Sequence, residues 1–340
     1  MAPMPDMPVD QRTDGPGVTR IDPDDPAASM YRLLAKVRAP LTLRDTMIMP
    51  VRFGYAGQTP PDAGAMPSWD HLFPGVAVSE IRVPSNDGPI RCQVYRPSAV
   101  GDGFPLMLYV HGGGFMVGRS EDTDYMTRRI SAENNMVVVS VNYRLAPEWP
   151  FPAGLDDCLA VYAWLRTHGR DLGGDAARVA VAGDSSGGNF AAALPLRARA
   201  NGLVPPEASV MFAPVLDLNF EAYDSFNSLA PTGVAYDAAF MGFLRGAYCR
   251  YPEWKHPHVS PLRADLDQFP PAMVIVGTHD PLVDSCVAFV RKARAAGCPD
   301  VELFVSDGMP HGFYFWPGMF RQEGDAYAAV RGFLNRHLGR

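Results

Sequence analysis

The residue whose surroundings most favour chemistry in this 340-residue chain is Ser185, the central serine of a G-x-S-x-G sequence running from Gly183 to Gly187. An apolar, strand-like run ends at Gly183, and a helix-compatible run of alanines begins after Gly188. A serine on such a strand-to-helix turn presents its Oγ above the sheet, and the flanking glycines let backbones approach closely. The N–H groups and positive dipole end of the following helix point at the same place. By itself the pattern also fits a plain glycine-rich turn.

A serine nucleophile needs a general base, and eight histidines compete for that role. His311 is the best candidate, because its loop between Pro310 and Gly312 follows the last short apolar run and so lies at the carboxyl edge of a parallel sheet. His256 and His258 form an H-x-H pair in a proline-rich loop without supporting acids or thiols, so we predict no metal site there. The remaining histidines are less suited to act as a base: His71, His111, His168, His279 and His337.

The acid that would orient this base is Asp280, which also follows an apolar run. Asp280 with Pro281 equally fits a helix N-cap followed by a proline at the first helical position, and the two interpretations are compatible. Asp284 lies one helical turn further on and fits a helix start. The order Ser185, Asp280, His311 is that of α/β-hydrolases and differs from the orders of other serine hydrolases.

A run of three glycines, Gly112 to Gly114, ends a third apolar run and is too flexible for a helix interior. We expect amide N–H groups of this loop to face a developing alkoxide, together with the N–H of Ser186. His111 and Gly112 are expected to hold the shape of the loop. A dinucleotide-binding loop requires G-x-G-x-x-G, which consecutive glycines do not supply.

Composition excludes several partners. The net charge of −7 and the lack of a Lys/Arg cluster argue against nucleic acid, and the longest apolar runs are strand-sized, which argues against a membrane span. The N-terminus has no basic and apolar leader pattern, so we expect a cytoplasmic protein. Five scattered cysteines are interpreted as reduced, mostly buried thiols: Cys92, Cys158, Cys249, Cys286 and Cys298. No cofactor is required, and a homodimer is one assembly that the sequence allows.

Eight short apolar runs predict strands: 76–84, 90–97, 106–110, 136–141, 179–182, 209–213, 272–276 and 301–305. Helix-period segments separate most of them: 155–168, 190–200 (kinked at Pro195), 283–296 and 325–338. The first two strands form a hairpin and the others alternate with helices, which predicts an α/β protein with a mostly parallel sheet flanked by helices. The stretch 218–258 contains a helical pattern at 238–248 and no strand, so we expect an excursion over the site.

The N-terminal region differs in composition from the rest of the chain. The first 25 residues are rich in proline and aspartate and are expected to be poorly ordered. A helix is predicted after Asp25, with Pro26 at its first position and Pro40 beyond its end.

Five motifs in this order make the chain resemble the bacterial hormone-sensitive-lipase-like carboxylesterases (family IV type) of the α/β-hydrolase superfamily. They are His111-Gly-Gly-Gly-Phe115, Tyr143-Arg-Leu-Ala-Pro-Glu-Trp-Pro-Phe-Pro-Ala-Gly-Leu-Asp-Asp157, Gly183-Asp-Ser-Ser-Gly-Gly188, Asp280-Pro-Leu-Val-Asp284 and His311-Gly-Phe313. The resemblance implies Ser185 as nucleophile, His311 as base and Asp280 as its orienter. The oxyanion hole implied is made by three N–H groups, those of Gly113, Gly114 and Ser186.

The same resemblance implies the fold and the domains. It predicts an α/β-hydrolase fold with a helical cap, formed by an N-terminal segment at 1–50 and an insertion at about 218–258 in a catalytic domain of residues 51–340. Two positions depart from the family pattern: Ser186 replaces alanine and Trp149 replaces histidine. Ser186 would act through its backbone N–H, so that change puts little in doubt.

The function implied is hydrolysis of short- to medium-chain carboxylic esters through an acyl-enzyme. An amidase or deacetylase would use the same residues and stays an open alternative. A non-catalytic homologue like the plant gibberellin receptors, which the chain also resembles, lacks the catalytic histidine that His311 supplies here. The expected pocket lining is apolar, although each residue also fits core or cap packing: Phe115, Phe212, Met241, Phe243, Phe313 and Phe315.

Overall fold

The computed structural model of the protein describes residues 69–99, 101–232, 236, 238–250, 252–298 and 300–339. The predicted cap segment at 1–50 and the predicted helix after Asp25 lie outside the described residues.

One eight-stranded sheet organises the described chain, with the strand order β1-β2-β4-β3-β5-β6-β7-β8. The strands are β1 (Val76–Val83), β2 (Ile90–Pro97), β3 (Phe104–Val110), β4 (Val137–Val141), β5 (Gly174–Asp184), β6 (Ala208–Phe212), β7 (Ala272–His279) and β8 (Val301–Pro310). β1 pairs with β2 and β2 with β4 in antiparallel fashion, whereas every pairing from β4 to β8 is parallel. The prediction of eight mostly parallel strands is confirmed.

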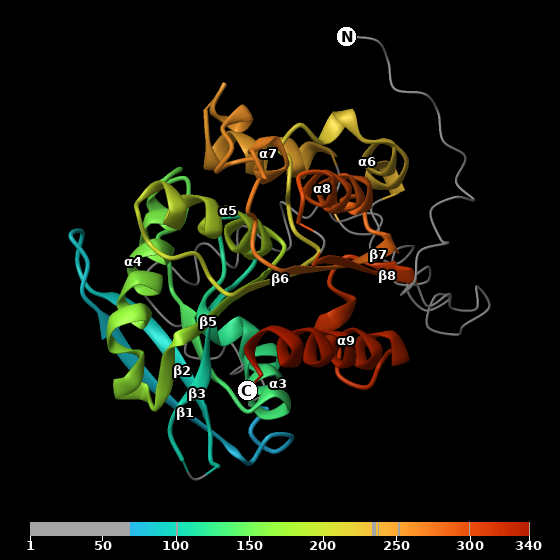
Figure 1. Ribbon diagram of the computed structural model, residues 1–340. Helices are drawn as coiled ribbons and strands as arrows, with labels where there is room; N and C mark the ends of the chain where they lie inside the picture. Colours follow the sequence, from blue (N-terminus) through green and yellow to red (C-terminus); the bar gives the residue numbers. More distant parts are fainter. Residues whose placement is uncertain are drawn as a thin grey trace, which may run out of the picture.

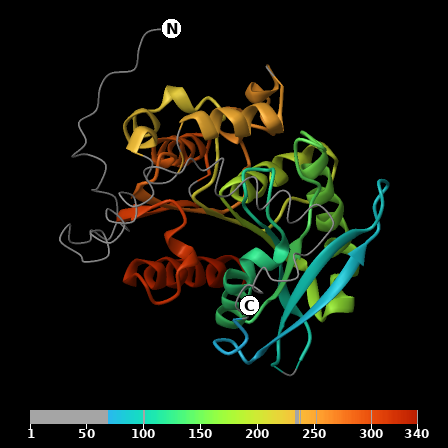
Figure 2. The ribbon, with the colours of Figure 1, turned by 180° about the vertical axis from the view of Figure 1, so that it is seen from behind.

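Helices cover both faces of this sheet (Figure 1). α4 (Ala153–His168), α5 (Ser186–Ala200) and α8 (Val283–Ala295) pack on one face, and α3 (Asp124–Asn134) and α9 (Arg321–Leu338) pack together on the other. The view from behind shows the same two layers (Figure 2). The chain is therefore a three-layer α/β structure, as the sequence predicted.

Strand β3 illustrates why the central strands have uninterrupted apolar sequences. Leu106, Leu108 and Val110 point into the core beneath α4 and α5, while Met107 and Tyr109 point into the core beneath α3 and α9. All five side chains are fully buried. A parallel strand covered by helices on both sides needs apolar residues at every position rather than at alternate ones.

Short 3-10 helices complete the described elements: η3 (Ser120–Thr123), η4 (Gly169–Leu172), η5 (Phe220–Ala222), η6 (Ala230–Thr232), η7 (Glu253–Lys255), η8 (Pro261–Arg263) and η9 (Phe313–Phe315). Within the described part of the chain, no helix combines the length and apolar character that a membrane crossing requires.

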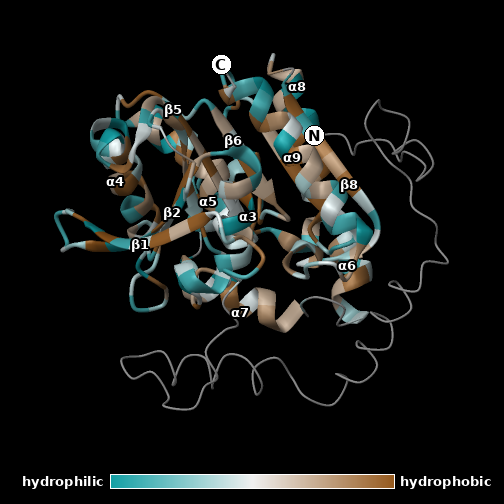
Figure 3. Ribbon diagram, turned by 90° about the horizontal axis from the view of Figure 1, so that it is seen from below, coloured by the Kyte–Doolittle hydropathy of each residue, from teal (hydrophilic) through white to brown (hydrophobic). Residues whose placement is uncertain are grey.

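Where it is described, the expected excursion between β6 and β7 contains helices and no strand. It contains α6 (Asp224–Leu229) and α7 (Ala238–Tyr248), which lie together at the top of Figure 1. The helix expected at 238–248 is confirmed at those residues. Most of α7 takes the brown shades of apolar residues in Figure 3, because only Arg245 interrupts its small and apolar side chains.

The two ends of the excursion are bonded to each other, between the end of β6 and the start of β7. The Leu262 N–H donates to the Leu216 carbonyl at 3.0 Å. Beside this bond, Arg263 forms two hydrogen bonds of 3.0 and 2.9 Å with the carboxylate of Asp217. The Asp217 carboxylate also accepts the Tyr223 hydroxyl at 2.9 Å. The two ends of the excursion are therefore fastened to each other by a buried carboxylate.

Candidate active site

Ser185 occupies a strained turn between β5 and α5. Its backbone angles are φ 54° and ψ −116°, a region that L-residues rarely adopt. A Cβ at Gly183 would lie 2.4 Å from the Gly187 carbonyl oxygen, and one at Gly187 would lie 2.0 Å from that of Val110. Both glycines are required because the turn packs backbone against backbone, as the sequence predicted.

His311 and Asp280 meet at the carboxyl ends of β8 and β7. Nδ1 of His311 lies 2.8 Å from Oδ2 of Asp280. The other carboxylate oxygen accepts the Leu282 N–H at 2.9 Å, so Asp280 orients the histidine and caps a turn at once. The β7–β8 pairing is irregular just before these residues, between Gly277 and His279, and a Cβ at Gly277 would lie 1.9 Å from the Met309 carbonyl oxygen.

The environment of His311 favours its protonated form. Burial lowers the pKa of the imidazole, but the charge and hydrogen bond of Asp280 outweigh this and raise the pKa above its ordinary value. The ring of Tyr236 stands edge-on to the imidazole, with centroids 5.0 Å apart. Nε2 is buried and has no hydrogen-bond partner in the described chain, so the Ser185 hydroxyl does not donate to it here. Such bonds often tighten only when substrate binds.

The glycine loop after β3 presents free amide groups beside this turn. Gly113 and Gly114 have φ values of 117° and 62°. No hydrogen bond in the described chain uses their N–H groups. Ser186 is the first residue of α5, where N–H groups lack an acceptor within the helix. The Gly112 N–H, by contrast, donates to Oδ1 of Asp184 at 3.1 Å and is not available to a ligand.

His111 supports the loop from inside the core. Its Nδ1 lies 2.7 Å from the Gly112 carbonyl oxygen, and its ring stacks on Tyr143 with centroids 4.3 Å apart. Burial lowers the pKa of His111 to about 4, so the ring is neutral at physiological pH and donates from Nδ1. The loop-shaping role of His111 stays a prediction, which these contacts support.

Helix α7 packs directly on the glycine loop. A Cβ at Gly114 would lie 2.7 Å from Cδ1 of Leu244. Tyr248 stacks on Phe115 with ring centroids 3.7 Å apart. With Tyr236 against His311, the excursion therefore contacts both the glycine loop and the histidine.

Several residues expected near a pocket serve other purposes. Phe212 and Phe313 are fully buried in the core beneath α9, and Phe115 is buried between Tyr248 and Phe190. Phe243 on α7 is half-exposed. Core packing thus accounts for the first three, an alternative that the sequence left open. Two further residues are buried or partly buried in apolar surroundings: Met241 and Phe315.

Three residues that the sequence analysis disfavoured as catalytic or metal-binding groups make structural contacts: Asp284, His256 and His258. Asp284 lies in the first turn of α8, and its Oδ2 accepts the Ser225 N–H at the start of α6 at 2.8 Å. The rings of His256 and His258 lie 5.1 Å apart, and the His258 N–H donates to Nδ1 of His256. All five cysteines are buried free thiols, as expected.

The motif from Tyr143 to Asp157 is an ion-pair clamp. Asp157 is buried, and its two oxygens accept the Arg144 backbone N–H at 2.8 Å and the Arg144 Nε and Nη2 at 2.9–3.1 Å. Trp149, at one of the positions that depart from the family, is exposed and lies 5.3 Å from the Arg144 guanidinium. The same motif contacts the glycine loop, because the Tyr143 hydroxyl donates to the His111 carbonyl at 2.9 Å and the Ala146 N–H to the Phe115 carbonyl at 2.9 Å.

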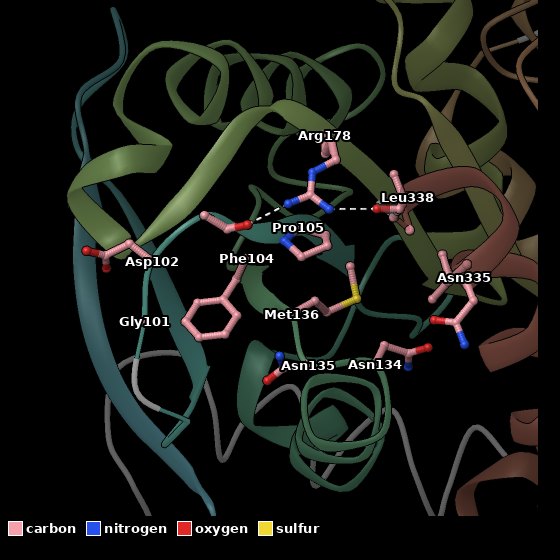
Figure 4. Close-up of a pocket in the computed structure, with 13 residues that line it drawn as sticks. Gly101, Asp102, Phe104, Pro105, Asn134, Asn135, Met136, Arg178, Asn335 and Leu338 are labelled. Carbon is pink, nitrogen blue, oxygen red and sulfur yellow. Dashed lines mark hydrogen bonds between the residues drawn. The ribbon is translucent and has the colours of Figure 1, made fainter.

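A cavity of about 330 Å³ lies at the amino ends of β3 and β5, the opposite edge of the sheet from Ser185 (Figure 4). Arg178 reaches into it and donates to the carbonyls of Gly103 and Leu338. Its Nε binds Asp175 at 2.8 Å. Every nitrogen of this guanidinium is therefore bonded to another part of the chain, and no residue of the candidate site lines the cavity.

Three residues at the site were not singled out from the sequence: Asp184, Tyr236 and Leu244. Asp184 stands at a variable position of the G-x-S-x-G pattern, and the available signal was a carboxylate at the end of an apolar strand. For Leu244 the helical pattern indicated a buried face but not what it covers. No sequence pattern pointed to Tyr236.

Comparison with known proteins gives a matching family and several similar proteins. Residues 107–315 match the family described as the alpha/beta hydrolase fold. The chain is 36% identical over 248 residues to the carboxylesterase NlhH of Mycobacterium tuberculosis, an alignment covering 71% of this chain and 77% of that protein. It is 31% identical over 271 residues to the ethyl acetate hydrolase of Pseudomonas putida, covering 77% and 83%. A solved esterase from the bacterial hormone-sensitive lipase family has a TM-score of 0.77 at 28% identity, covering 94% of this chain and 100% of that one.

Proposed function

Since the chain belongs to the bacterial hormone-sensitive-lipase family of α/β-hydrolases, its reaction class is carboxylic ester hydrolysis, and we propose that Ser185 performs it through an acyl-enzyme. The observation that carries this proposal is the strained turn that holds Ser185 beside the free N–H groups of the glycine loop. A hydroxyl next to oxyanion donors is the arrangement that acyl transfer requires.

The proposed reaction has two halves. Neutral His311 takes the Ser185 proton on Nε2 as Oγ attacks the ester carbonyl, and Asp280 stabilises the imidazolium through Nδ1. The N–H groups of Gly113, Gly114 and Ser186 would hold the oxyanion. His311 then protonates the leaving alcohol, and a water activated by the same histidine hydrolyses the acyl-serine ester and restores Ser185.

We assign the preference for short- and medium-chain acyl groups to the excursion, which acts as a cap. Leu244 packs on Gly114 and Tyr236 packs on His311, so the space above the reaction centre is bounded by apolar and aromatic side chains. The ethyl acetate hydrolase of Pseudomonas putida, named for a short-chain ester, supports this choice.

The test is hydrolysis of p-nitrophenyl acetate, butyrate, octanoate and palmitate by the wild type, by Ser185→Ala and by Ser79→Ala. Ser79 is exposed on β1, far along the chain from the site, and serves as the matched control. We expect rapid turnover of acetate and butyrate by the wild type and the control, and a loss of at least about 10⁴-fold in kcat for Ser185→Ala. Equal rates for the wild type and Ser185→Ala would overturn the serine mechanism. Faster turnover of arylamides than of esters would overturn the proposed substrate class.

A further inference from the structure

Asp184 is a buried acid that the proposed mechanism does not use. It is the last residue of β5 and immediately precedes Ser185, and only 2% of its surface is exposed. Burying a carboxylate without partners is costly, so such a group needs hydrogen bonds. Its partners show what it holds in place.

Both donors to Asp184 come from β3 and the loop after it. Oδ1 accepts the Tyr109 hydroxyl at 2.9 Å and the Gly112 N–H at 3.1 Å. The second oxygen is in contact too, since a Cβ at Gly112 would lie 2.2 Å from Oδ2. The carboxylate therefore bears directly on the backbone of the first loop glycine, and Tyr109 fixes the carboxylate in turn.

Holding Gly112 in place also affects the two glycines that follow it. Gly113 and Gly114 carry the free N–H groups, and glycines at φ 117° and 62° have little intrinsic preference for that conformation. Asp184 is one peptide bond from the nucleophile and one hydrogen bond from the loop.

We propose that Asp184 is a positioning residue that fixes the oxyanion loop relative to Ser185 by accepting the Gly112 N–H. This inference rests on the proposed function of Ser185 and adds a second buried carboxylate to the site. Asp184 acts through the loop and does not touch the reacting atoms.

The charge of Asp184 adds an effect that a purely structural residue would not have. Burial raises the pKa of Asp184 to about 6, against the opposing hydrogen bonds of Tyr109 and Gly112 and the charge of His311. Above that pH its negative charge joins that of Asp280 in raising the pKa of His311. The other titratable groups that face Asp184 are tyrosines whose own pKa values burial raises: Tyr109, Tyr143, Tyr314 and Tyr327.

The experiment measures kcat and KM for p-nitrophenyl butyrate from pH 5 to 9 with full-length Asp184→Ala, Asp184→Asn and Tyr109→Phe. Removing the acceptor in Asp184→Ala should lower kcat by about 10- to 100-fold with KM changed less than about threefold, because transition-state contacts are lost. Asn keeps an acceptor oxygen but no charge, so Asp184→Asn should recover most of kcat. The acid limb of its pH–rate profile should move to lower pH by roughly half a unit, because the charge of Asp184 no longer raises the pKa of His311.

Glu323→Gln is the matched control. Glu323 is also buried, but it binds Tyr125 and Arg129 between α3 and α9. We expect Glu323→Gln to leave the acid limb and kcat unchanged. An unchanged acid limb in Asp184→Asn, or wild-type kcat in Asp184→Ala, would overturn the proposal.

Two measurements separate this proposal from the proposed function and from misfolding. A wild type inactive on every ester would refute the ester mechanism, yet hydrogen exchange of the Gly112 amide and the NMR titration of His311 would still report on Asp184. Faster Gly112 exchange in Asp184→Ala supports positioning, and wild-type exchange contradicts it. If Asp184→Ala does not fold, Asp184→Asn still gives the NMR titration of His311, and Tyr109→Phe, which removes the hydroxyl that fixes the carboxylate, gives the Gly112 exchange.

Discussion

Two buried carboxylates in this protein each hold a basic side chain, and they differ in what they leave unpaired. Asp157 accepts the Arg144 N–H, Nε and Nη2, and the remaining Arg144 nitrogen binds Asp87 at 3.0 Å. From His311, Asp280 accepts a hydrogen bond from Nδ1 alone, and the histidine's Nε2 is buried and without a partner in the described chain. The same chemistry thus gives a closed ion pair in one region and an open one in the other.

The difference shows that the same fold can use one buried pair for stability and another for reactivity. Arginine is charged at any accessible pH and fills its fork with fixed acceptors, so its pair can only stabilise the fold. Histidine changes charge near neutral pH and keeps one nitrogen free, so its pair can accept and return a proton. Both carboxylates are buried, and the choice of base decides the role.

The largest effect is expected at the open pair. Asp280→Asn should lower kcat by on the order of 10⁴-fold, because the amide no longer stabilises the imidazolium or fixes its tautomer. The Leu282 N–H keeps an acceptor, so the thermal midpoint should change little. Steady-state kinetics and thermal unfolding measure both quantities. A large loss of stability with kcat preserved would reverse the assignment of this pair.

The closed pair should respond in the opposite way. Asp157→Ala removes the acceptor of the Arg144 backbone N–H and Nε and leaves the guanidinium with Asp87, so it should lower the free energy of unfolding by about 2 kcal/mol. We expect kcat of the folded fraction to stay within about threefold of the wild type. Urea denaturation and active-site titration would check this. A loss of kcat comparable to that of Asp280→Asn would show that the clamp belongs to the chemistry.

Of these two pairs, only the open one should govern the pH dependence of activity. His311 must be neutral to act as a base, so kcat/KM falls as pH drops through its pKa. Because Asp280 raises that pKa, the acid limb should lie above about 6.5, the ordinary histidine value. The pH profile of kcat/KM for p-nitrophenyl butyrate tests this. An acid limb centred below pH 6 would contradict the raised pKa.

The smallest effect is expected from a conservative change in the closed pair. Arg144→Lys keeps the charge but loses the two-pronged contact with Asp157, which should cost about 1 kcal/mol of unfolding free energy. Activity should not change. Urea unfolding of this variant beside Asp157→Ala would separate the contribution of geometry from that of charge. Equal losses in the two variants would mean that charge alone contributes nothing.

Much of the fold could be predicted because its signals are local. Buried parallel strands produce continuous apolar runs, and the glycines around Ser185 mark a turn that no side chain would fit. Helix α3 was not predicted because its buried face contains polar residues. Among them Thr127, Arg128 and Ser131 bond to backbone carbonyls, including those of Val76 and Met136, so burial there is not matched by apolar sequence.

The extent of β8 was also underestimated, since the predicted run ended at Val305 and the strand continues to Pro310. Its last residues pair with β7 across an irregularity at Gly277, which no sequence pattern marks. The residues of the candidate site likewise divide into those with a local sequence signal and those without one. Residues at strand ends could be predicted from order and spacing, whereas the contact between Asp184 and Gly112 spans 72 positions and follows only from the fold.

The fastening of the excursion at Asp217 and Arg263 has a consequence for how this protein can diversify. Because the Leu216 carbonyl accepts the Leu262 N–H and Arg263 binds Asp217, the chain between them forms a loop whose ends are bonded to each other. The entropy of closing such a loop changes slowly with its length. We therefore expect that this segment can be exchanged for the equivalent segment of a relative while the strands that carry Ser185, Asp280 and His311 stay in register.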